Sequence, residues 1–479
     1  MDMNSPTQET SFTTSIPSKL YSNLTKFIKK IKKIGEDDPR RITHCAKLGL
    51  ALTLSSLLYY IRPLYNGFGE AGMWAILTVV VVFEFTVGGT LSKSINRGFA
   101  TLFAGALGLG AHHLASVCGV TGKPIVVGLM VFSLAAVSTF TRFYPNVKRR
   151  YDYGVLIFIL TFTMVAVSGY RVGQIVELAH QRLSTVLIGG ATCIIVSIFI
   201  CPVWAGPDLQ FLVAKNIEKL ADFLQGYGGE LLTCAGDESS NDSGAKNVEK
   251  SLNGYKSVLD SKATVDLLAN LAWWEPPHGK FKLNHPWKQY LKIGRLSREC
   301  ASLIDSLNTY TISKSLTTAT SSEFQTIIRQ PCIEMSTESA KALVEIASAI
   351  KQMRPPESAE THVQKAKSAA DQLKTTLQSY SMPPKPDLQE MVPLLVTASV
   401  LIDIISSVDE IVLSVCELSR KAGFKNPKSA GEQTPEQIFH RGIVSPVEDD
   451  GDHVGVDIQA DSSTDSPEKK SATELSGGP

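Results

Sequence analysis

Residues 98–122 read GFATLFAGALGLGAHHLASVCGVTG and contain no Asp, Glu, Lys or Arg. About 20 apolar residues in a helix are enough to cross the hydrocarbon core of a bilayer. Because lipid offers no hydrogen-bond partners to the backbone, a segment that crosses it must satisfy its own amides, as a helix does. This stretch therefore predicts a membrane-spanning helix, and its neighbours are interpreted from it.

The region around this stretch has very few charges. Residues 42–204 hold 15 charged residues in 163 positions, whereas the other 316 positions of the 479-residue chain hold 78. The second density is ordinary for a soluble protein. The net charge of +1 argues against a nucleic-acid-binding protein, which usually carries a basic excess. About one third of the chain is therefore built for the membrane.

Gaps between charges predict six membrane helices in residues 42–204. They cover about 43–61, 72–91, 99–118, 124–141, 153–170 and 183–204. Valine-rich runs such as Val79–Val82 also occur in buried strands. Six long segments joined by short charged turns favour helices instead. The expected fold class is all-α, with a six-helix transmembrane domain followed by a cytosolic helical bundle.

The distribution of Lys and Arg predicts the orientation of these helices. Counted from Lys26, thirteen basic residues fall in the segment before the first helix and in the turns after the second and fourth, against four on the opposite side. Both termini are therefore expected in the cytosol. Residues 1–41 form a basic cytosolic leader, in which Leu20–Ile34 places Lys among apolar residues at helical spacing. This segment either lies on an anionic leaflet or only fixes the topology.

Residues 205–424 show the apolar stripes of soluble helices. Stripes run through about 209–224, 246–272, 286–313, 321–353, 358–380 and 388–422. They predict a cytosolic helical domain. Residues 425–479 are expected to be a disordered acidic tail, because 441–479 hold nine acids against three bases. Ser445 and Ser466, each followed by Pro, are candidate sites for a kinase, unless the tail only aids solubility.

No catalytic constellation appears in the sequence. Because no nucleophile–base pair or metal-ligand set stands out, an enzyme is disfavoured, and neither cofactor nor metal is expected. Gly105, Gly108 and Gly110 lie inside an uncharged span, as do Gly189 and Gly190. Small residues at such positions let membrane helices approach closely.

The sign of the charges is the main functional signal. Residues 42–204 contain eleven Lys or Arg and four acids. The positive-inside rule explains part of this excess, but it does not explain basic residues on the non-cytosolic side. Basic groups that face a water-filled path lower the barrier for anions. The candidate anion path comprises Lys93, Arg97, Arg142, Arg149, Arg171 and Arg182. Glu84, an acid expected deep in a span, is either a gate or the structural partner of a nearby base.

Four stretches resemble one family, the plant aluminium-activated malate transporters, which are anion channels. They are Trp74–Arg97, Tyr151–Arg171, Cys201–Leu209 and Trp274–Gly279 (WEPPHG). The resemblance implies six membrane helices per chain, a homodimer and a basic pore along the dimer axis. It implies malate and other organic or inorganic anions as permeants, and the plasma or the vacuolar membrane as location, with the plasma membrane favoured here.

Two features depart from this family. The resemblance implies that aluminium-responsive members use acidic groups in the outer loops. This chain offers Glu70 and Glu177 there, while Asn66 and 172–174 are uncharged, which disfavours aluminium activation. The family commonly has a basic or other polar residue directly before the WEPPHG motif, where this chain has Trp273. Within the motif, Glu275 is expected to accept hydrogen bonds from backbone or Arg, and the two prolines after it to stop a helix.

Three functions compete. The leading hypothesis is a passive channel for malate and other anions. The alternative is a proton-coupled organic-acid exporter, which requires a titrating group, for which Glu84 is the candidate. The third is a membrane anchor whose helical domain binds partners without transport.

Overall fold

The computed structural model describes residues 18–61, 69–168, 175–228, 254–314, 323–380 and 388–425. Within these ranges every regular element is a helix, and the only strand-like feature is an isolated bridge between His278 and Phe281. The expectation of an all-α fold is therefore confirmed. The expected acidic tail lies outside the described residues, apart from Lys425.

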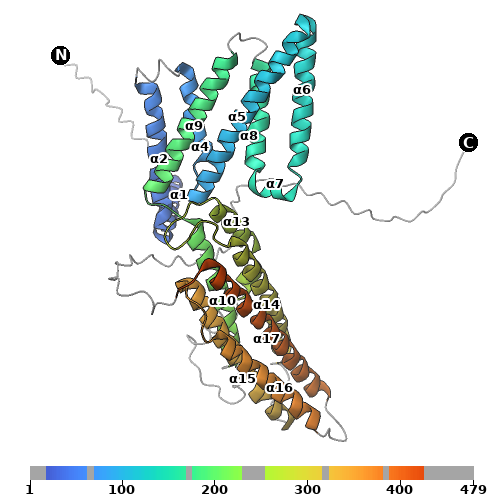
Figure 1. The fold of residues 1–479 in the computed structure, drawn as a ribbon. Coiled ribbons are helices and arrows are strands. Elements are labelled where there is room, and N and C mark those ends of the chain that lie inside the picture. The colour runs from blue at the N-terminus through green and yellow to red at the C-terminus, as the bar shows by residue number, and fades with distance from the viewer. Residues whose placement is uncertain are drawn as a thin grey trace, which may run out of the picture. The chain divides into compact units, whose positions relative to one another are not determined.

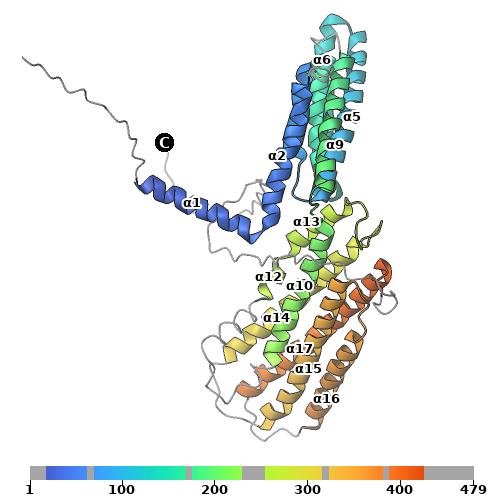
Figure 2. The ribbon, with the colours of Figure 1, turned by 90° about the vertical axis from the view of Figure 1, so that its left-hand side faces the viewer.

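Six apolar helices occupy the low-charge region, and they run side by side in Figures 1 and 2. They are α2 (Pro39–Tyr60), α4 (Met73–Val82), α5 (Val87–Val117), α6 (Gly119–Thr141), α8 (Asp152–Ser168) and α9 (Ile175–Phe199). Helix α5 packs against α6, α8 and α9, while α4 packs against α2 and α9. The short elements η1 (Gly69–Gly72) and α7 (Pro145–Arg150) precede α4 and α8.

These helices differ in length. Helices α2, α5, α6 and α9 are long and apolar enough to cross a membrane, whereas α4 has 10 residues and α8 has 17. At about 1.5 Å per residue, α4 covers about 15 Å, roughly half of the hydrocarbon core. The chain is thus a multi-pass membrane protein, but α4 is too short to serve alone as one of six complete spans.

The helix expected over 72–91 is interrupted. Helix α4 ends at Val82, and α5 begins at Val87 instead of near 99. The side chain of Thr86 caps α5 by accepting from the amide of Gly89, and the Thr90 hydroxyl accepts from the amide of Glu84 and donates to its carbonyl. These bonds satisfy the backbone at the break. Lys93 and Arg97 consequently lie within α5 and not in a turn. They therefore do not count among the basic residues that indicate the orientation of the helices.

The last membrane helix is also displaced from its expected range of 183–204. Helix α9 begins at Ile175 and ends at Phe199, and the backbone of Cys201 adopts a φ of 43°. The ammonium group of Lys47 donates to the carbonyl of Cys201 at 3.3 Å, and the amide of Val87 donates to that of Val203 at 2.9 Å. These bonds fix the chain where it leaves the helix. Residues 200–204 therefore connect α9 to the next helix.

Two of the five glycines expected to permit close packing have that role. A Cβ on Gly108 would lie 2.7 Å from the side chain of Val165 on α8, and one on Gly189 would lie 2.7 Å from the carbonyl of Ala75 on α4. A Cβ on Gly105 or Gly110 would meet nothing within 4 Å, and one on Gly190 would make ordinary contacts. The small residues at 108 and 189 therefore bring α5 against α8 and α9 against α4.

This difference predicts opposite outcomes for two matched substitutions. Gly189→Ala is expected to lower the thermal unfolding midpoint of the detergent-solubilised protein by several degrees, because overpacking against a backbone carbonyl costs about 1–3 kcal/mol. Gly110→Ala is expected to leave the midpoint unchanged or to raise it, because alanine favours helix by about 1 kcal/mol. Fluorescence-detected size-exclusion chromatography after heating measures both. Equal midpoints for the two variants would contradict this packing.

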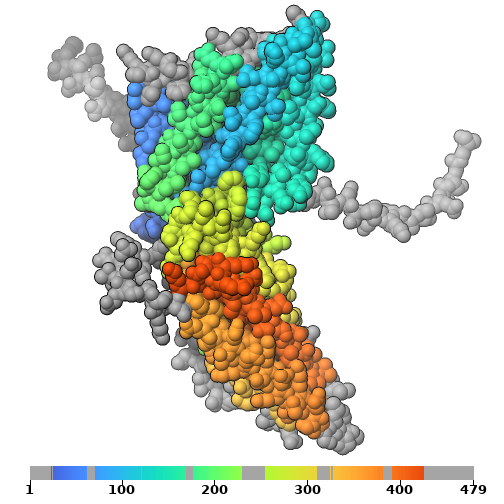
Figure 3. Space-filling view, in the orientation of Figure 1, coloured from blue at the N-terminus to red at the C-terminus, as the bar shows by residue number. Residues whose placement is uncertain are grey.

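The remaining helices form the soluble part. They are α10 (Ala205–Gly226), α12 (Lys256–Leu259), α13 (Lys262–Trp273), α14 (Trp287–Lys314), α15 (Glu323–Gln352), α16 (Ala359–Ser379) and α17 (Leu388–Ala422). One hydrophobic core joins them. Helix α17 is apolar enough to cross a membrane, but its buried face belongs to this core. Helix α13 also packs against α5, and Figure 3 shows its residues beside the membrane helices.

The basic leader contains helix α1 (Ser18–Asp37), which meets α2 at an angle in Figure 2. Only Asp38 separates the two helices, and its side chain caps α2 by accepting from the amide of Arg40. Phe27, Ile28 and Ile31 of α1 are exposed among lysines. An exposed apolar stripe flanked by Lys is typical of helices that lie in the membrane interface. That location of α1 stays a prediction.

Candidate functional site

Arg182 lies two turns inside α9, although the sequence predicted it at the start of a helix. Its guanidinium group stacks on the ring of Trp74 at 3.8 Å from the ring centroid, and the residue is only 7% exposed. Arg182 and Trp74 belong to the wall of a cavity of about 520 Å³, together with Met164, Ser168 and Gln181. The cation therefore sits beside an open space within the membrane helices.

Arg97 on α5 is a second buried cation, 6% exposed. It donates from Nη1 to the hydroxyl of Tyr153 at 3.1 Å, while its Nε has no hydrogen-bond partner. The guanidinium groups of Arg97 and Arg182 are close enough to repel each other. Among the described residues, neither has a carboxylate partner. Two uncompensated cations in an apolar bundle are costly, and such residues mark functional sites in membrane proteins.

Lys93 lies one turn before Arg97 on α5. It forms an ion pair with Glu84, and its ammonium group lies 5.6 Å from the ring centroid of Tyr153. Glu84 stands in the non-helical segment between α4 and α5, and its side chain is 39% exposed. Its depth in the membrane stays a prediction. The ion pair agrees with a structural acid, and both roles considered for Glu84 stay predictions.

The other candidate cations lie elsewhere. Arg142, at the end of α6, forms two hydrogen bonds with Asp152, at 2.7 and 3.1 Å. Arg149 is an exposed residue of α7 whose carbonyl accepts from the side-chain amide of Asn270. Arg171 lies outside the described residues. The structure thus brings Lys93, Arg97 and Arg182 together and places Arg142 and Arg149 in other surroundings.

Sequence reasoning missed the aromatic partners of this cluster. Trp74 contacts Arg182, and Tyr153 contacts both Arg97 and Lys93. Both aromatic residues occur in the stretches that carry the family resemblance, but nothing in the sequence pairs them with these cations. An aromatic face attracts a cation without neutralising its charge, so the cluster stays positive.

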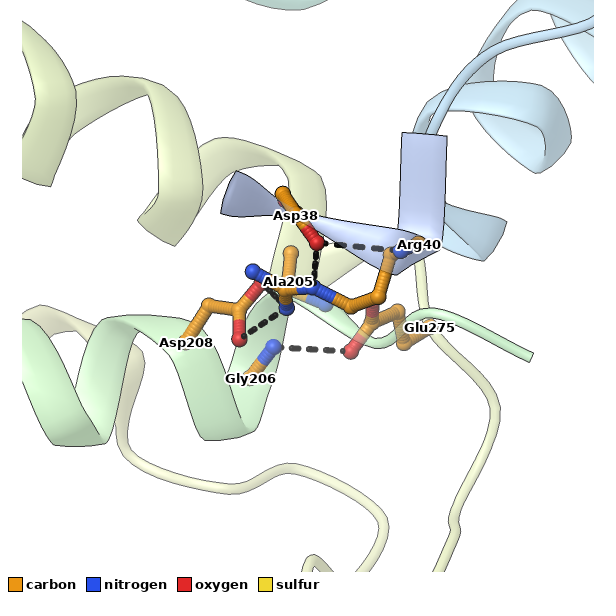
Figure 4. Close-up of polar contacts among 6 residues, drawn as sticks. All are labelled: Asp38, Arg40, Ala205, Gly206, Asp208 and Glu275. Carbon is orange, nitrogen blue, oxygen red and sulfur yellow. Dashed lines mark hydrogen bonds and ion pairs between the residues drawn. The ribbon is translucent and has the colours of Figure 1, made fainter. Parts of the chain in front are cut away.

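A second group of contacts joins the membrane helices to the soluble part (Figure 4). The buried carboxylate of Glu275 accepts from the amides of Ala205 at 2.5 Å and Gly206 at 3.0 Å, at the start of α10. Backbone donors were expected for this residue. Burial raises the pKa of Glu275 to about 7, although the two amides favour the ionised form. The carboxylate thereby fixes the N-terminus of α10.

The same junction includes α2. The guanidinium group of Arg40 contacts Asp38 at 3.1 Å and Asp208 at 3.2 Å, which ties the start of α2 to the first turn of α10 (Figure 4). The ring of His278 stacks on that of Trp204 at 3.8 Å. Burial lowers the pKa of His278, so it is neutral at neutral pH. In the part of the chain that the structure describes, His, Cys, Asp and Glu side chains form no group of three able to hold a metal ion.

Comparisons with known proteins agree with this architecture. A family model described as "Aluminium activated malate transporter" matches residues 32–383. The chain is 47% identical over 432 residues to aluminum-activated malate transporter 2 of Arabidopsis thaliana, covering 90% of this chain and 84% of the relative. It is 43% identical over 430 residues to aluminum-activated malate transporter 1 of Triticum aestivum, covering 88% and 91%. Aluminum-activated malate transporter 10 of Arabidopsis thaliana is 38% identical over 453 residues, covering 87% and 90%.

Proposed function

The chain belongs to the aluminium-activated malate transporter family, and on this premise we propose that it is a passive membrane channel for malate and other organic or inorganic anions. The matching relatives are named transporters, which confirms the expectation that the chain is not an enzyme. They come from plants, namely Arabidopsis and wheat. Their names state malate transport. The passive mechanism and the transport of other anions are what the proposal adds.

One observation carries the proposal, namely the pair of buried guanidinium groups of Arg97 and Arg182 without a carboxylate partner among the described residues. A passing anion neutralises their charge. Its attraction to the two cations in turn compensates for the water that the anion loses on entering the membrane. Guanidinium also matches the geometry of a carboxylate, because it offers parallel N–H donors. The cavity beside Arg182 gives this cation an approach from one end of the bundle.

A homodimer with the path at its axis is part of the proposal. Helices α5 and α9 form an apolar groove of about 350 Å³, lined by Gly98, Gly190 and Ala191. Small residues along such a groove favour close packing of another membrane helix. A second copy docked here brings α5 and α9 of both subunits, with their arginines, around a shared path. Lys93, Arg97 and Arg182 then contribute to it, while Arg142 and Arg149 are assigned to its cytosolic approach.

The topology and location are also proposals. Basic residues before α2 and in α7 support cytosolic termini on both ends of the chain. The plasma membrane is favoured over the vacuolar membrane. Glu177, which was expected in an outer loop, lies in the first turn of α9, where it is exposed and accepts from Gln181. We expect no activation by aluminium. The candidate kinase sites, Ser445 and Ser466, lie outside the described residues.

Voltage-clamp recording with defined malate and proton gradients tests the mechanism. For a passive channel, the reversal potential is expected to follow the malate gradient by about 30 mV per tenfold change for the dianion, on the RT/zF scale. The reversal potential is expected to be independent of the proton gradient.

Glu84 separates the channel from the coupled exporter. Glu84→Gln is expected to leave the dependence on malate unchanged, with Lys93→Gln as the control for loss of the same ion pair. A reversal potential that follows protons in the wild type and loses this dependence in Glu84→Gln alone would favour the exporter. Purified protein that passes no anion under any gradient would favour the third hypothesis, a membrane anchor.

A further inference from the structure

A second large cavity lies away from the paired arginines. Its volume is about 840 Å³, and it is lined by residues of α7, α13, the 276–286 segment, the start of α14 and the end of α17. This volume falls in the range of small-molecule sites. Neither Arg97 nor Arg182 contributes to its wall.

Four of the cations in this cavity lack an acidic partner among the residues that the structure describes. Arg149, Arg150, Lys282 and Lys288 line the cavity, and none of them forms an ion pair with a described residue. A fifth, Lys421, pairs with Glu417. The uncompensated cations make the cavity a site for a negatively charged ligand.

The other titratable groups of the wall do not reverse this charge. Glu275 is engaged by two backbone amides, and its raised pKa, about 7, reduces its negative charge at neutral pH. Burial lowers the pKa of His285 to about 4 and also lowers that of His278, so both rings are neutral. Asp266 is the remaining acid. The wall is therefore net positive at cytosolic pH.

Trp273 gives the cavity an aromatic surface. It is 45% exposed although it is a large apolar residue, and the guanidinium group of Arg150 lies 4.1 Å from its ring centroid. The Nε of Arg150 is buried without a hydrogen-bond partner. An exposed indole next to an unsatisfied guanidinium fits a ligand that combines a flat ring with an anionic group.

The wall of this cavity is held by aromatic contacts. The rings of Phe281 and Trp287 stack at 5.4 Å, and His285 lies 4.5 Å from Trp287 between centroids. Trp274 supports Trp273 edge-on at 5.0 Å. Such packing fixes the side chains before a ligand arrives, which reduces the entropy lost on binding.

We propose that this cavity binds an organic anion that carries a flat ring, with the ring against Trp273 and its anionic groups at Arg150 and Lys288. The site shares Arg149 with the proposed cytosolic approach of the anion path, but it contains neither Arg97 nor Arg182 and does not depend on the channel mechanism. Because the side-chain amide of Asn270 donates to the carbonyl of Arg149 at 3.0 Å, and α13 packs against α5, the ligand joins the membrane helices to the soluble helices. Its binding stabilises that junction.

Isothermal titration on the full-length protein in lipid nanodiscs tests this site, with phthalate and succinate as probes. Both are dicarboxylates, and only phthalate has a ring. Phthalate is expected to bind about fivefold more tightly than succinate, because its ring stacks on Trp273 beside the cation of Arg150. Trp273→Leu is expected to remove this preference, and Lys288→Gln to weaken both probes.

Controls locate the binding. Arg295→Gln removes an exposed arginine outside the cavity and is expected to change nothing. Arg182→Gln, in the membrane path, is expected to keep the preference for phthalate, because that preference comes from Trp273. Equal affinity for the two probes, or phthalate binding that survives Trp273→Leu and Lys288→Gln, would overturn the proposal. Binding lost in Arg182→Gln but kept in Trp273→Leu would also overturn it, because the ligand then sits in the membrane path. Unchanged unfolding midpoints of the variants show that they are folded.

Discussion

Arg182→Glu is expected to leave less than about 1% of the malate current while the protein still reaches the membrane. A unit charge about 8 Å from an ion interacts with it by about 2 kcal/mol at an effective dielectric constant of 20. Charge reversal replaces an attraction of this size by an equal repulsion, a change of about 4 kcal/mol. This energy corresponds to more than a hundredfold decrease in the rate of anion passage. The buried position of Arg182 beside a cavity excludes much of the screening by salt. Voltage clamp with a surface-labelling assay measures both current and delivery.

Two matched variants serve as controls for this result. Arg182→Lys keeps the charge but loses the flat guanidinium that stacks on Trp74, so a reduced current is expected rather than none. Arg142→Gln removes an arginine that is assigned only to the cytosolic approach and is already paired with Asp152, so most of the current is expected to remain. Wild-type current and selectivity in Arg182→Glu would remove this residue from the anion path.

Much of the membrane fold follows from where charges are absent. The uncharged stretch of residues 98–122 lies within α5 and the start of α6, and the gap before Asp208 contains most of α9. The break after Val82 could not be predicted, because phenylalanine and valine continue through it. A contact distant in sequence lies next to it: a Cβ on Gly88 would lie 2.2 Å from the carbonyl of Leu271, so only glycine at this position lets α13 approach the first turn of α5 so closely.

The sequence predicted which types of residue form the candidate site, but not which residues contact each other there. Charge counting selected Arg97 and Arg182, because basic residues near apolar spans are rare enough to be conspicuous. The same counting selected Arg142, whose partner Asp152 stands ten residues away across a turn. Sequence spacing alone cannot tell a neutralised cation from a free one. Trp273 was visible as an anomaly, and its contact with Arg150 becomes apparent only when α7 and α13 are placed together.

Glu275→Gln is expected to remove a pH dependence from the junction between the membrane and soluble helices. Burial raises the pKa of Glu275 from 4.5 to about 7. Between these values the folded state binds more protons than the unfolded state, so stability falls as pH rises from about 4.5 to about 7 and is level above. The total change is about 3 kcal/mol at about 1.4 kcal/mol per pH unit. The protection factors of the Ala205 and Gly206 amides against hydrogen exchange measure it locally.

Glu275→Ala separates this proton effect from the loss of the hydrogen bonds. Alanine leaves the amides of Ala205 and Gly206 without an acceptor, and each buried unsatisfied donor costs about 1–3 kcal/mol. Protection of both amides is therefore expected to fall at every pH, whereas Gln retains one acceptor and loses only the pH slope. Glu299→Gln, at an exposed ion pair on α14, serves as the control and is expected to change neither amide. If the wild-type protection is level between pH 4.5 and 7, Glu275 is ionised throughout, and the two amides outweigh its burial.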